Sequence, residues 1–319
     1  MMENDVKKLQ IKAVIGIIII ICVYVIFIIF SDIEKIFSNF SNVMIHSFII
    51  PIAVLFSITI TARSFIQKQI LKQLDIEISF KQSFLIYFSG LSMLVTPFGM
   101  GQTIKSYFLK KYFNISYTKS VPLVLAERLY DFISIIILLG ITTIFIFRDN
   151  LFIFTVLCSC LIIIILLFTK SKSFNNFLKQ KIIKISFFSQ RISTLDKLTD
   201  TISQITKLNK ILKILPQVFI IITIESIVIH LCIISFQINL TYFDSIQLFY
   251  SSLLLGIFSF LPGGVGVTEG IFVNLMVNEG YSVPLASSVI IFLRFITIWS
   301  LSIIGFIFVF YLLRKQNSI

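Results

Sequence analysis

Two stretches rich in proline and glycine, TPFGMGQ at residues 96–102 and LPGGVGV at residues 261–267, interrupt long apolar sequence. Both contain the pattern P-x-G-x-G, which begins at Pro97 in the first stretch and at Pro262 in the second. Proline removes a backbone donor, and glycine adopts backbone conformations that other residues avoid. Each stretch therefore predicts a break between two short helices. The residues predicted to form the breaks are Pro97, Gly99, Gly101, Pro262, Gly263, Gly264 and Gly266.

An arginine follows each break at nearly the same distance, with 31 residues from Pro97 to Arg128 and 32 from Pro262 to Arg294. The recurrence predicts two related units, at about residues 84–147 and 246–313, each with a half-helix, a break, a second short helix and a long span. Three full spans are expected between the breaks, so the units have opposite orientations in a membrane. Such inverted repeats are typical of transporters, whose discontinuous helices meet near the middle of the bilayer. A simpler interpretation is that the breaks only bend helices and let them pack closely.

The composition is that of an integral membrane protein. Hydrophobic residues make up 57% of the 319-residue chain and charged residues only 13%, whereas about a quarter of a soluble domain is charged. Six apolar runs are close to the roughly 20 residues that cross a hydrocarbon core. They are Ile11–Phe30, Ile45–Thr61, Val121–Phe147, Leu151–Phe168, Leu215–Phe236 and Pro284–Leu313. The predicted fold class is an all-α polytopic membrane protein with six full spans, in a single domain at residues 1–319.

The distribution of basic residues predicts the orientation. Ten Lys and Arg residues lie within Lys170–Lys213, against two Asp residues, which indicates a cytoplasmic loop rather than a nucleic-acid site. Threading the spans outward from this loop places both termini, the Arg63–Lys81 linker and the Lys105–Lys119 stretch in the cytoplasm. We expect a multi-pass protein of the cell membrane, with no nucleic-acid partner. Apolar residues at steps of three or four predict an amphipathic helix in the cytoplasmic loop at residues 169–214.

Two further apolar segments, residues 84–96 and 246–261, are short and run into the breaks. The charge asymmetry holds only if neither segment crosses, so each is expected to dip into the membrane and return to the side it entered. The first re-entrant hairpin then opens to the cytoplasm and the second to the outside. A hydropathy plot would count both and report about eight spans. Irregular backbone at this depth is tolerated only where protein buries it or water reaches it, so the breaks are where function is expected.

Ionisable side chains lie inside the predicted spans. An ionised group at the centre of the bilayer costs at least about 2.5–3.5 kcal/mol, so it persists where it is paired or lines a polar path. We predict that Arg128 and Arg294 bind a lipid phosphate, while Glu127 and Asp131 hold the arginines in place. Removal of Arg128 should then leave both carboxylates unpaired. The residues expected to bind substrate are Arg128, Arg294, Glu127, Asp131, Glu269 and Gln102. The alternative is that these charges only clamp helices together.

The sequence contains no recognisable catalytic arrangement. No Ser-His-Asp set is apparent, and P-x-G-x-G lacks the lysine of a Walker motif. The four cysteines and two histidines do not have the spacing of metal ligands. We therefore expect no enzyme activity, no metal site and no cofactor.

Two groups of residues resemble those of a known family. The first is Pro97-x-Gly99-x-Gly101 with the downstream motif A-E-R-x-x-D at residues 126–131, and the second is LPGGVGVTE at residues 261–269 with Arg294 and Trp299. With these motifs, nearly the whole chain resembles the flippase-like transmembrane family typified by the membrane region of lysylphosphatidylglycerol synthases.

In those synthases, the membrane region moves an aminoacylated lipid between leaflets, and a separate soluble domain makes that lipid. This chain ends six residues after Leu313, so the resemblance implies a stand-alone member with the transport half and without the aminoacyltransferase domain. Many relatives have a glutamate where this chain has Gln102. The difference removes one carboxylate and weighs against a cationic aminoacyl headgroup as the substrate.

We therefore expect a flippase or transporter that moves a phospholipid or lipid-linked precursor between leaflets. Two vestibules, one from each face, would meet at the re-entrant hairpins, and the partners would be anionic or phosphate-bearing membrane lipids. Two alternatives stay open. The first is a transporter of a small soluble solute, which needs a path sealed from lipid. The second is a non-catalytic membrane subunit that supports a glycosyltransferase or another lipid- or saccharide-modifying enzyme.

Overall fold

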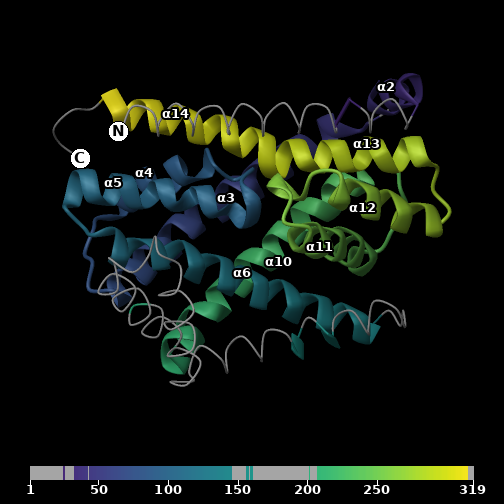
Figure 1. Ribbon diagram of the computed structural model, residues 1–319. Helices are drawn as coiled ribbons and strands as arrows, with labels where there is room; N and C mark the ends of the chain where they lie inside the picture. The colour runs from purple at the N-terminus through teal and green to yellow at the C-terminus, as the bar shows by residue number, and fades with distance from the viewer. Residues whose placement is uncertain are drawn as a thin grey trace, which may run out of the picture.

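The computed structural model describes residues 24–25, 32–41, 43–145, 156–157, 159–160, 201 and 207–314. Every regular element within these residues is a helix (Figure 1). The predicted cytoplasmic loop at 169–214 lies outside the described residues, except for Thr201 and its last part. That last part is already helical, because α10 (Leu208–Ile234) begins at Leu208.

Long helices run along the length of the molecule: α3 (Ile45–Gln73), α6 (Tyr117–Phe145), α10, and α13 (Val283–Arg294), which continues through a short π-helix at Phe295–Trp299 into α14 (Ser300–Arg314). Three described stretches, Phe48–Gln73, Asn209–Ile234 and Val283–Arg314, are long and apolar enough to cross a membrane. They overlap three of the six predicted spans, and the first continues to Gln73, beyond the predicted end at Thr61. A fourth span, predicted at residues 121–147, is helical as far as Phe145. The other two, 11–30 and 151–168, lie almost wholly outside the described residues.

Both predicted breaks separate two short helices. In the first unit, α4 (Phe80–Leu91) leads through the 3-10 helix η1 (Pro97–Thr103) into α5 (Ile104–Phe113). In the second unit, α11 (Tyr242–Phe258) leads through η3 (Pro262–Gly264) into α12 (Val267–Asn278). Figure 1 places α4 and α5 at one end of the bundle and α11 and α12 at the other.

The half-helices begin four residues earlier than the apolar pattern predicts, at Phe80 and Tyr242 rather than at residues 84 and 246. Each begins with a capping box, in which the side chains of the first and fourth residues bond to one another's backbone N–H groups. Ser79 and Gln82 form the box of α4, and Thr241 and Asp244 form that of α11. The first turn of each helix is polar, so the apolar pattern did not include it.

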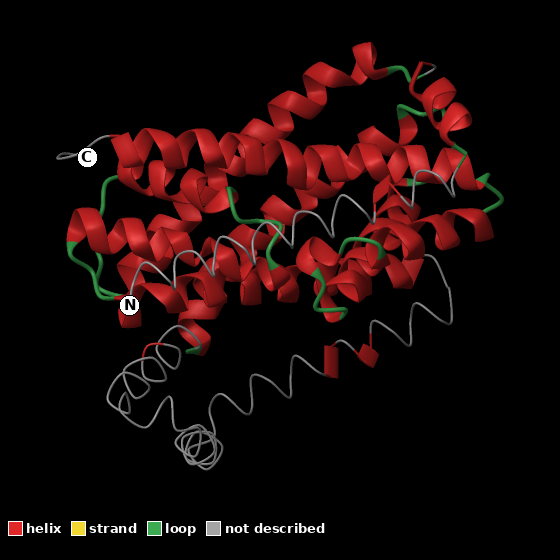
Figure 2. Ribbon diagram, turned by 45° about the horizontal axis from the view of Figure 1, so that its top comes forward, coloured by secondary structure: helices red, strands yellow, loops and turns green. Residues whose placement is uncertain are grey.

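The two breaks have similar backbones and touch each other. The third residue of each P-x-G-x-G pattern has positive φ, 64° at Gly99 and 66° at Gly264, a conformation that glycine adopts without steric cost. A Cβ atom at Gly263 would lie 3.6 Å from the carbonyl oxygen of Val95, so η3 lies against the chain that leads into η1. Figure 2 accordingly shows loop segments inside the bundle as well as at its ends.

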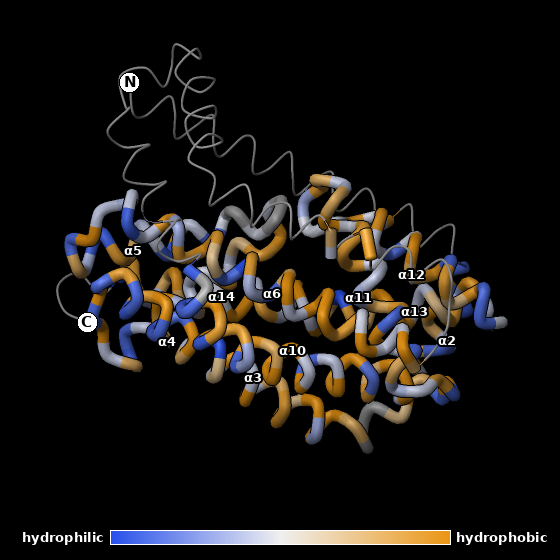
Figure 3. Tube along the Cα trace, turned by 90° about the horizontal axis from the view of Figure 1, so that it is seen from below, coloured by the Kyte–Doolittle hydropathy of each residue, from blue (hydrophilic) through white to orange (hydrophobic). Residues whose placement is uncertain are grey.

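Basic side chains gather at the α5 end of the bundle. Lys110 and Lys111 lie in the last turn of α5, and Arg314 ends α14 beside them, where the Tyr112 hydroxyl donates to the carbonyl oxygen of Leu312. Lys210, near the start of α10, donates to the carbonyl oxygen of Gln73 at the end of α3, over 2.7 Å. Figure 3 shows hydrophilic segments at the α5 end and at the α2 (Ile33–Ser41) end, with mostly hydrophobic stretches between them.

Candidate functional site

A network of ion pairs joins α3, α6 and α10 beside the first break. The Arg63 guanidinium in α3 donates from Nη1 to Asp131 Oδ1 in α6 over 2.7 Å, and from Nε to Glu225 Oε1 in α10 over 2.6 Å. Its Nη2 donates to the second oxygen of Glu225, also over 2.7 Å. This fork-to-fork geometry is the strong form of an arginine–carboxylate pair. Arg63 therefore ties together three helices.

A second ion pair joins the short helix after the break to the long helix α6. Lys105 Nζ in α5 lies 2.6 Å from Glu127 Oε2, and the lysine side chain is fully buried. The ammonium also lies 4.6 Å from the centre of the Tyr87 ring, where a cation–π attraction adds to the pair. A Cβ atom at Gly90 would lie 2.2 Å from Lys105 Cε, so the lysine stem crosses α4 where a glycine leaves room for it.

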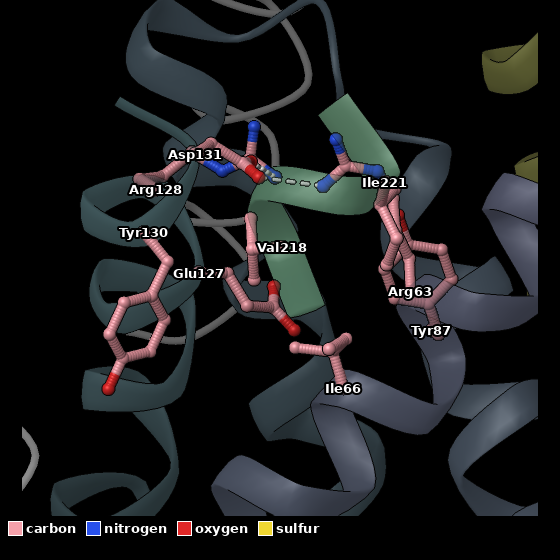
Figure 4. Close-up of a pocket in the computed structure, with 9 residues that line it drawn as sticks. All are labelled: Arg63, Ile66, Tyr87, Glu127, Arg128, Tyr130, Asp131, Val218 and Ile221. Atoms are coloured by element: carbon pink, nitrogen blue, oxygen red, sulfur yellow. Dashed lines mark hydrogen bonds and ion pairs between the residues drawn. The ribbon is translucent and has the colours of Figure 1, made fainter. Parts of the chain in front are cut away.

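Arg128 is the most open cation of this cluster. Its Nη2 lies 3.2 Å from Asp131 Oδ2, while Asp131 Oδ1 is bonded to Arg63, and 35% of the Arg128 side chain is exposed. Arg128 Nε has no hydrogen-bond partner among the described residues. Figure 4 shows the pocket that these side chains form, which has a free volume of about 20 Å³. This volume is enough for about one water molecule.

Among the described residues, one buried ion pair lies at the second break. Arg294 Nε in α13 donates to Glu269 Oε1 in α12 over 2.7 Å, and each side chain is only 1% exposed. Arg294 Nη2 donates to the carbonyl oxygen of Gly263 over 2.9 Å, and the backbone N–H of Gly266 donates to Glu269 Oε2 over 2.7 Å. The pair therefore holds the irregular backbone of the break from both sides, which satisfies polar groups that the break would leave unpaired.

Aromatic residues complete the second site. The Tyr24 hydroxyl donates to Glu269 Oε1 over 2.9 Å, and Trp299 Nε1 lies 3.4 Å from the same hydroxyl. The π-helix at Phe295–Trp299 follows Arg294 directly. Single π-turns of this kind are frequent at functional sites because they shift the positions of the side chains that follow.

The structure changes the predicted roles of two residues. Glu127 was expected to hold Arg128, but the partner of Glu127 is Lys105. Asp131 does contact Arg128, but it also pairs with Arg63 at the shorter distance. The expectation that loss of Arg128 leaves both carboxylates unpaired is therefore wrong. Glu269 and Arg294 were both expected to bind substrate, and the structure shows them paired with each other.

Gln102 is buried in η1, with 1% of its surface exposed. Neither of its amide atoms has a hydrogen-bond partner in the described part of the chain. A Cβ atom at Gly99 would lie 3.3 Å from Gln102 Nε2 and 3.8 Å from Arg128 Cδ, so Gly99 lies close to both the amide and the arginine. The structure thus brings Gln102 close to Arg128, and a role of Gln102 in substrate binding stays a prediction.

Sequence reasoning missed Arg63 and Lys105, which it assigned to cytoplasmic segments. Arg63 lies two residues after the predicted end of an apolar run, but α3 continues to Gln73 without interruption. Lys105 lies in the first turn of α5 and points into the bundle. A basic residue next to an apolar run has the same local pattern whether it faces the cytoplasm or a buried acid. Only the long-range contacts separate the two cases.

Within the part of the chain that the structure describes, no group of three His, Cys, Asp or Glu side chains could hold a metal ion. What the fold and the site define is a helical membrane protein whose two helix breaks are held by buried ion pairs. The chain belongs to the family of the lysylphosphatidylglycerol synthase TM region, which matches residues 13–305. No curated protein and no solved structure matches it.

Proposed function

We propose that this protein moves a phospholipid or a lipid-linked precursor between the leaflets of the cell membrane. Membership of a family named for the membrane region of a lipid-modifying synthase supports a lipid-related role. In this proposal the headgroup follows a protein-lined path past the breaks while the acyl chains stay in the bilayer, and the protein carries out no covalent chemistry itself.

The observation that carries the proposal is the state of Arg128. A guanidinium inside a span costs free energy unless it is paired or solvated. Arg128 has one ion-pair contact at 3.2 Å, and its side chain is 35% exposed. The other three cations of the two sites are more deeply buried and have closer contacts to carboxylates, Arg63 and Lys105 at the first break and Arg294 at the second. Arg128 is thus the cation best placed to bind a phosphate, which suits the planar fork of a guanidinium.

We further propose that both hairpins are re-entrant and form an inverted repeat, with both chain termini in the cytoplasm. Three features support this topology. The hairpins α4–α5 and α11–α12 lie at opposite ends of the bundle, the breaks touch between them, and basic helix ends gather on the α5 side. By the positive-inside rule that side faces the cytoplasm.

Cysteine labelling tests this topology. In a variant without the native cysteines, single cysteines at positions 240 and 280 should react with an impermeant maleimide on intact cells. Cysteines at positions 77 and 114 should react only after permeabilisation. Labelling of position 114 on intact cells would mean that α4 and α5 cross the membrane, which contradicts the re-entrant topology.

A second candidate is a static membrane subunit that supports a lipid- or saccharide-modifying enzyme. The specific observation in its favour is the closed site at the second break, where Arg294 and Glu269 are each 1% exposed and bind one another and the break itself. Such a site can clamp helices without contacting any lipid.

Lipid exchange in proteoliposomes decides between the two functions. The wild-type protein should accelerate the transfer of an acyl-chain-labelled phospholipid between leaflets relative to protein-free liposomes. Arg128→Lys keeps the charge but loses the planar fork, and should slow the exchange by about tenfold or more. Arg314→Lys, at the exposed end of α14, is the matched control and should exchange at the wild-type rate. If Arg128→Lys also keeps the full rate, Arg128 is structural and the supporting-subunit function is favoured.

A further inference from the structure

The cluster at the first break has no net charge. Three cations, Arg63, Lys105 and Arg128, lie among three carboxylates, and each cation has an ion-pair contact to at least one of the three. The carboxylates are Glu127, Asp131 and Glu225. A buried cluster in this state is balanced, and a ligand with a net charge would leave an uncompensated charge in a region of low dielectric.

Two groups of opposite sign remain unused in this cluster. Arg128 Nε has no hydrogen-bond partner within the described residues, and neither has Glu127 Oε1. Glu127 is only 8% exposed, so its free oxygen cannot be satisfied by bulk solvent. Both residues line the same pocket, and Figure 4 shows them leaving α6 on the side that faces Val218. The pocket therefore offers one cationic donor and one anionic acceptor from neighbouring positions of one helix.

We infer that this pocket binds a zwitterionic lipid headgroup, with its phosphodiester at Arg128 and its primary ammonium at Glu127. The inference rests on the proposed lipid-moving function of the same pocket, and it narrows the substrate class from any phosphate-bearing lipid to one that also carries an amine. Such a headgroup places its ammonium at the unused oxygen of Glu127 and its phosphodiester at the exposed part of the Arg128 guanidinium, and it leaves the cluster neutral. A purely anionic headgroup would bring a net negative charge towards the Glu127 carboxylate and could offer its free oxygen only a neutral hydroxyl donor, without a compensating positive charge.

The size of the pocket fits this arrangement. Its free volume of about 20 Å³ holds a group of about the size of one water molecule. An ammonium group has that size, whereas a phosphodiester is too large. The phosphodiester would therefore stay at the exposed edge of Arg128 while the ammonium enters the buried part beside Glu127. Glu127 and Arg128 line the same pocket, so one headgroup that carries both charges can contact the two side chains.

The test measures binding separately from transport. The full chain in detergent is titrated with phosphatidylethanolamine or with phosphatidylglycerol, which share the phosphodiester and differ in the amine, and bound lipid is counted by native mass spectrometry. We expect wild-type protein to bind phosphatidylethanolamine about tenfold more tightly, the usual effect of one hydrogen bond to a charged group. Equal affinity for the two lipids would overturn the inference.

Variants assign the preference to the pocket. Glu127→Gln alone leaves Lys105 buried without its acid and can fail to fold, so the variant used is the double substitution Lys105→Gln with Glu127→Gln, which removes both charges of the pair. It should lose the preference for phosphatidylethanolamine. The matched control, Glu77→Gln with Lys81→Gln at exposed positions, should keep it. A double variant in the pocket that still prefers phosphatidylethanolamine would overturn the inference.

Two further arms separate the possible failures. Glycerophosphoethanolamine has the same charges without acyl chains, and it should not displace the lipid at matched concentration. Displacement by this soluble molecule would overturn the assignment to a lipid. Leaflet exchange of both lipids is then measured in proteoliposomes. Selective binding without any exchange would refute the proposed transport and leave the headgroup assignment standing.

Discussion

The two helix breaks are held by ion pairs of opposite polarity. At the first break the short helix after the break supplies the cation, Lys105, and the long helix supplies the acid, Glu127. At the second break the short helix supplies the acid, Glu269, and the long helix supplies the cation, Arg294. In both pairs the charged atoms lie 2.6–2.7 Å apart. Both pairs join the short helix after the break to the long helix that follows it.

Either helix of the pair can supply the cation, since the two breaks have buried ion pairs of opposite polarity. At the second break Arg294, the arginine of the long helix, is the cation of the buried ion pair and is 1% exposed. At the first break Lys105 has taken that role, so the arginine of the long helix, Arg128, is left 35% exposed beside a shared carboxylate. The first break therefore presents a part-exposed arginine to a ligand. At the second break Arg294 Nη1 also has no hydrogen-bond partner among the described residues, but the side chain is almost completely buried.

The largest effect is expected from Arg294→Ala. It leaves the Glu269 carboxylate buried without its cation, and breaking a buried pair costs about 3–5 kcal/mol. The free energy of unfolding in detergent should fall by this amount. Lys35→Ala is the control, because Lys35 forms an exposed pair with Asp32 at 2.8 Å and surface pairs contribute about 0–1 kcal/mol. If the two substitutions cost the same, the Arg294–Glu269 pair is not a clamp.

A smaller effect is expected when both charges of the first clamp are exchanged, which reverses its polarity. Lys105→Glu or Glu127→Lys alone places two like charges together in a buried position, and each should destabilise strongly. The double exchange restores an ion pair with the polarity of the second clamp, so the two changes should show a coupling free energy of about 0.5–3 kcal/mol. Recovery should stay incomplete, since the exchange removes the cation from the Tyr87 ring.

The four unfolding free energies of this double-mutant cycle are measured under one condition. If the double variant is no more stable than the less stable of the two single variants, the polarity of the pair matters. The two clamps are then not equivalent.

The sequence predicted the features that are local in the chain. Both breaks, the positions of their glycines and three long apolar helices follow from proline, glycine and hydropathy alone. The pairing of Glu269 with Arg294 was not predicted, although both residues belong to one repeat unit and both lie in apolar surroundings.

The partners of Glu127 and Asp131 could not be predicted in the same way. Within one helix, Arg128 is the nearest cation to both carboxylates, and local spacing therefore assigns it to both. Arg63 reaches Asp131 from a helix 68 residues away in sequence, and Lys105 reaches Glu127 over 22 residues through the turn between α5 and α6. Such pairs depend on how helices pack, which hydropathy and charge counts do not specify.

The smallest effect on stability is expected from Arg128→Ala, the counterpart of Arg294→Ala. Glu127 keeps Lys105 and Asp131 keeps Arg63, so the substitution leaves neither carboxylate without a cation. The part-exposed contact at 3.2 Å should contribute no more than about 1 kcal/mol to the free energy of unfolding. Lipid exchange in proteoliposomes, normalised to folded protein, should nevertheless fall to the rate of protein-free liposomes, because the cation offered to the headgroup phosphate is gone. A loss of several kcal/mol together with lost exchange would mean that Arg128 is a third clamp, and the contrast between the two breaks would no longer explain which of them handles the lipid.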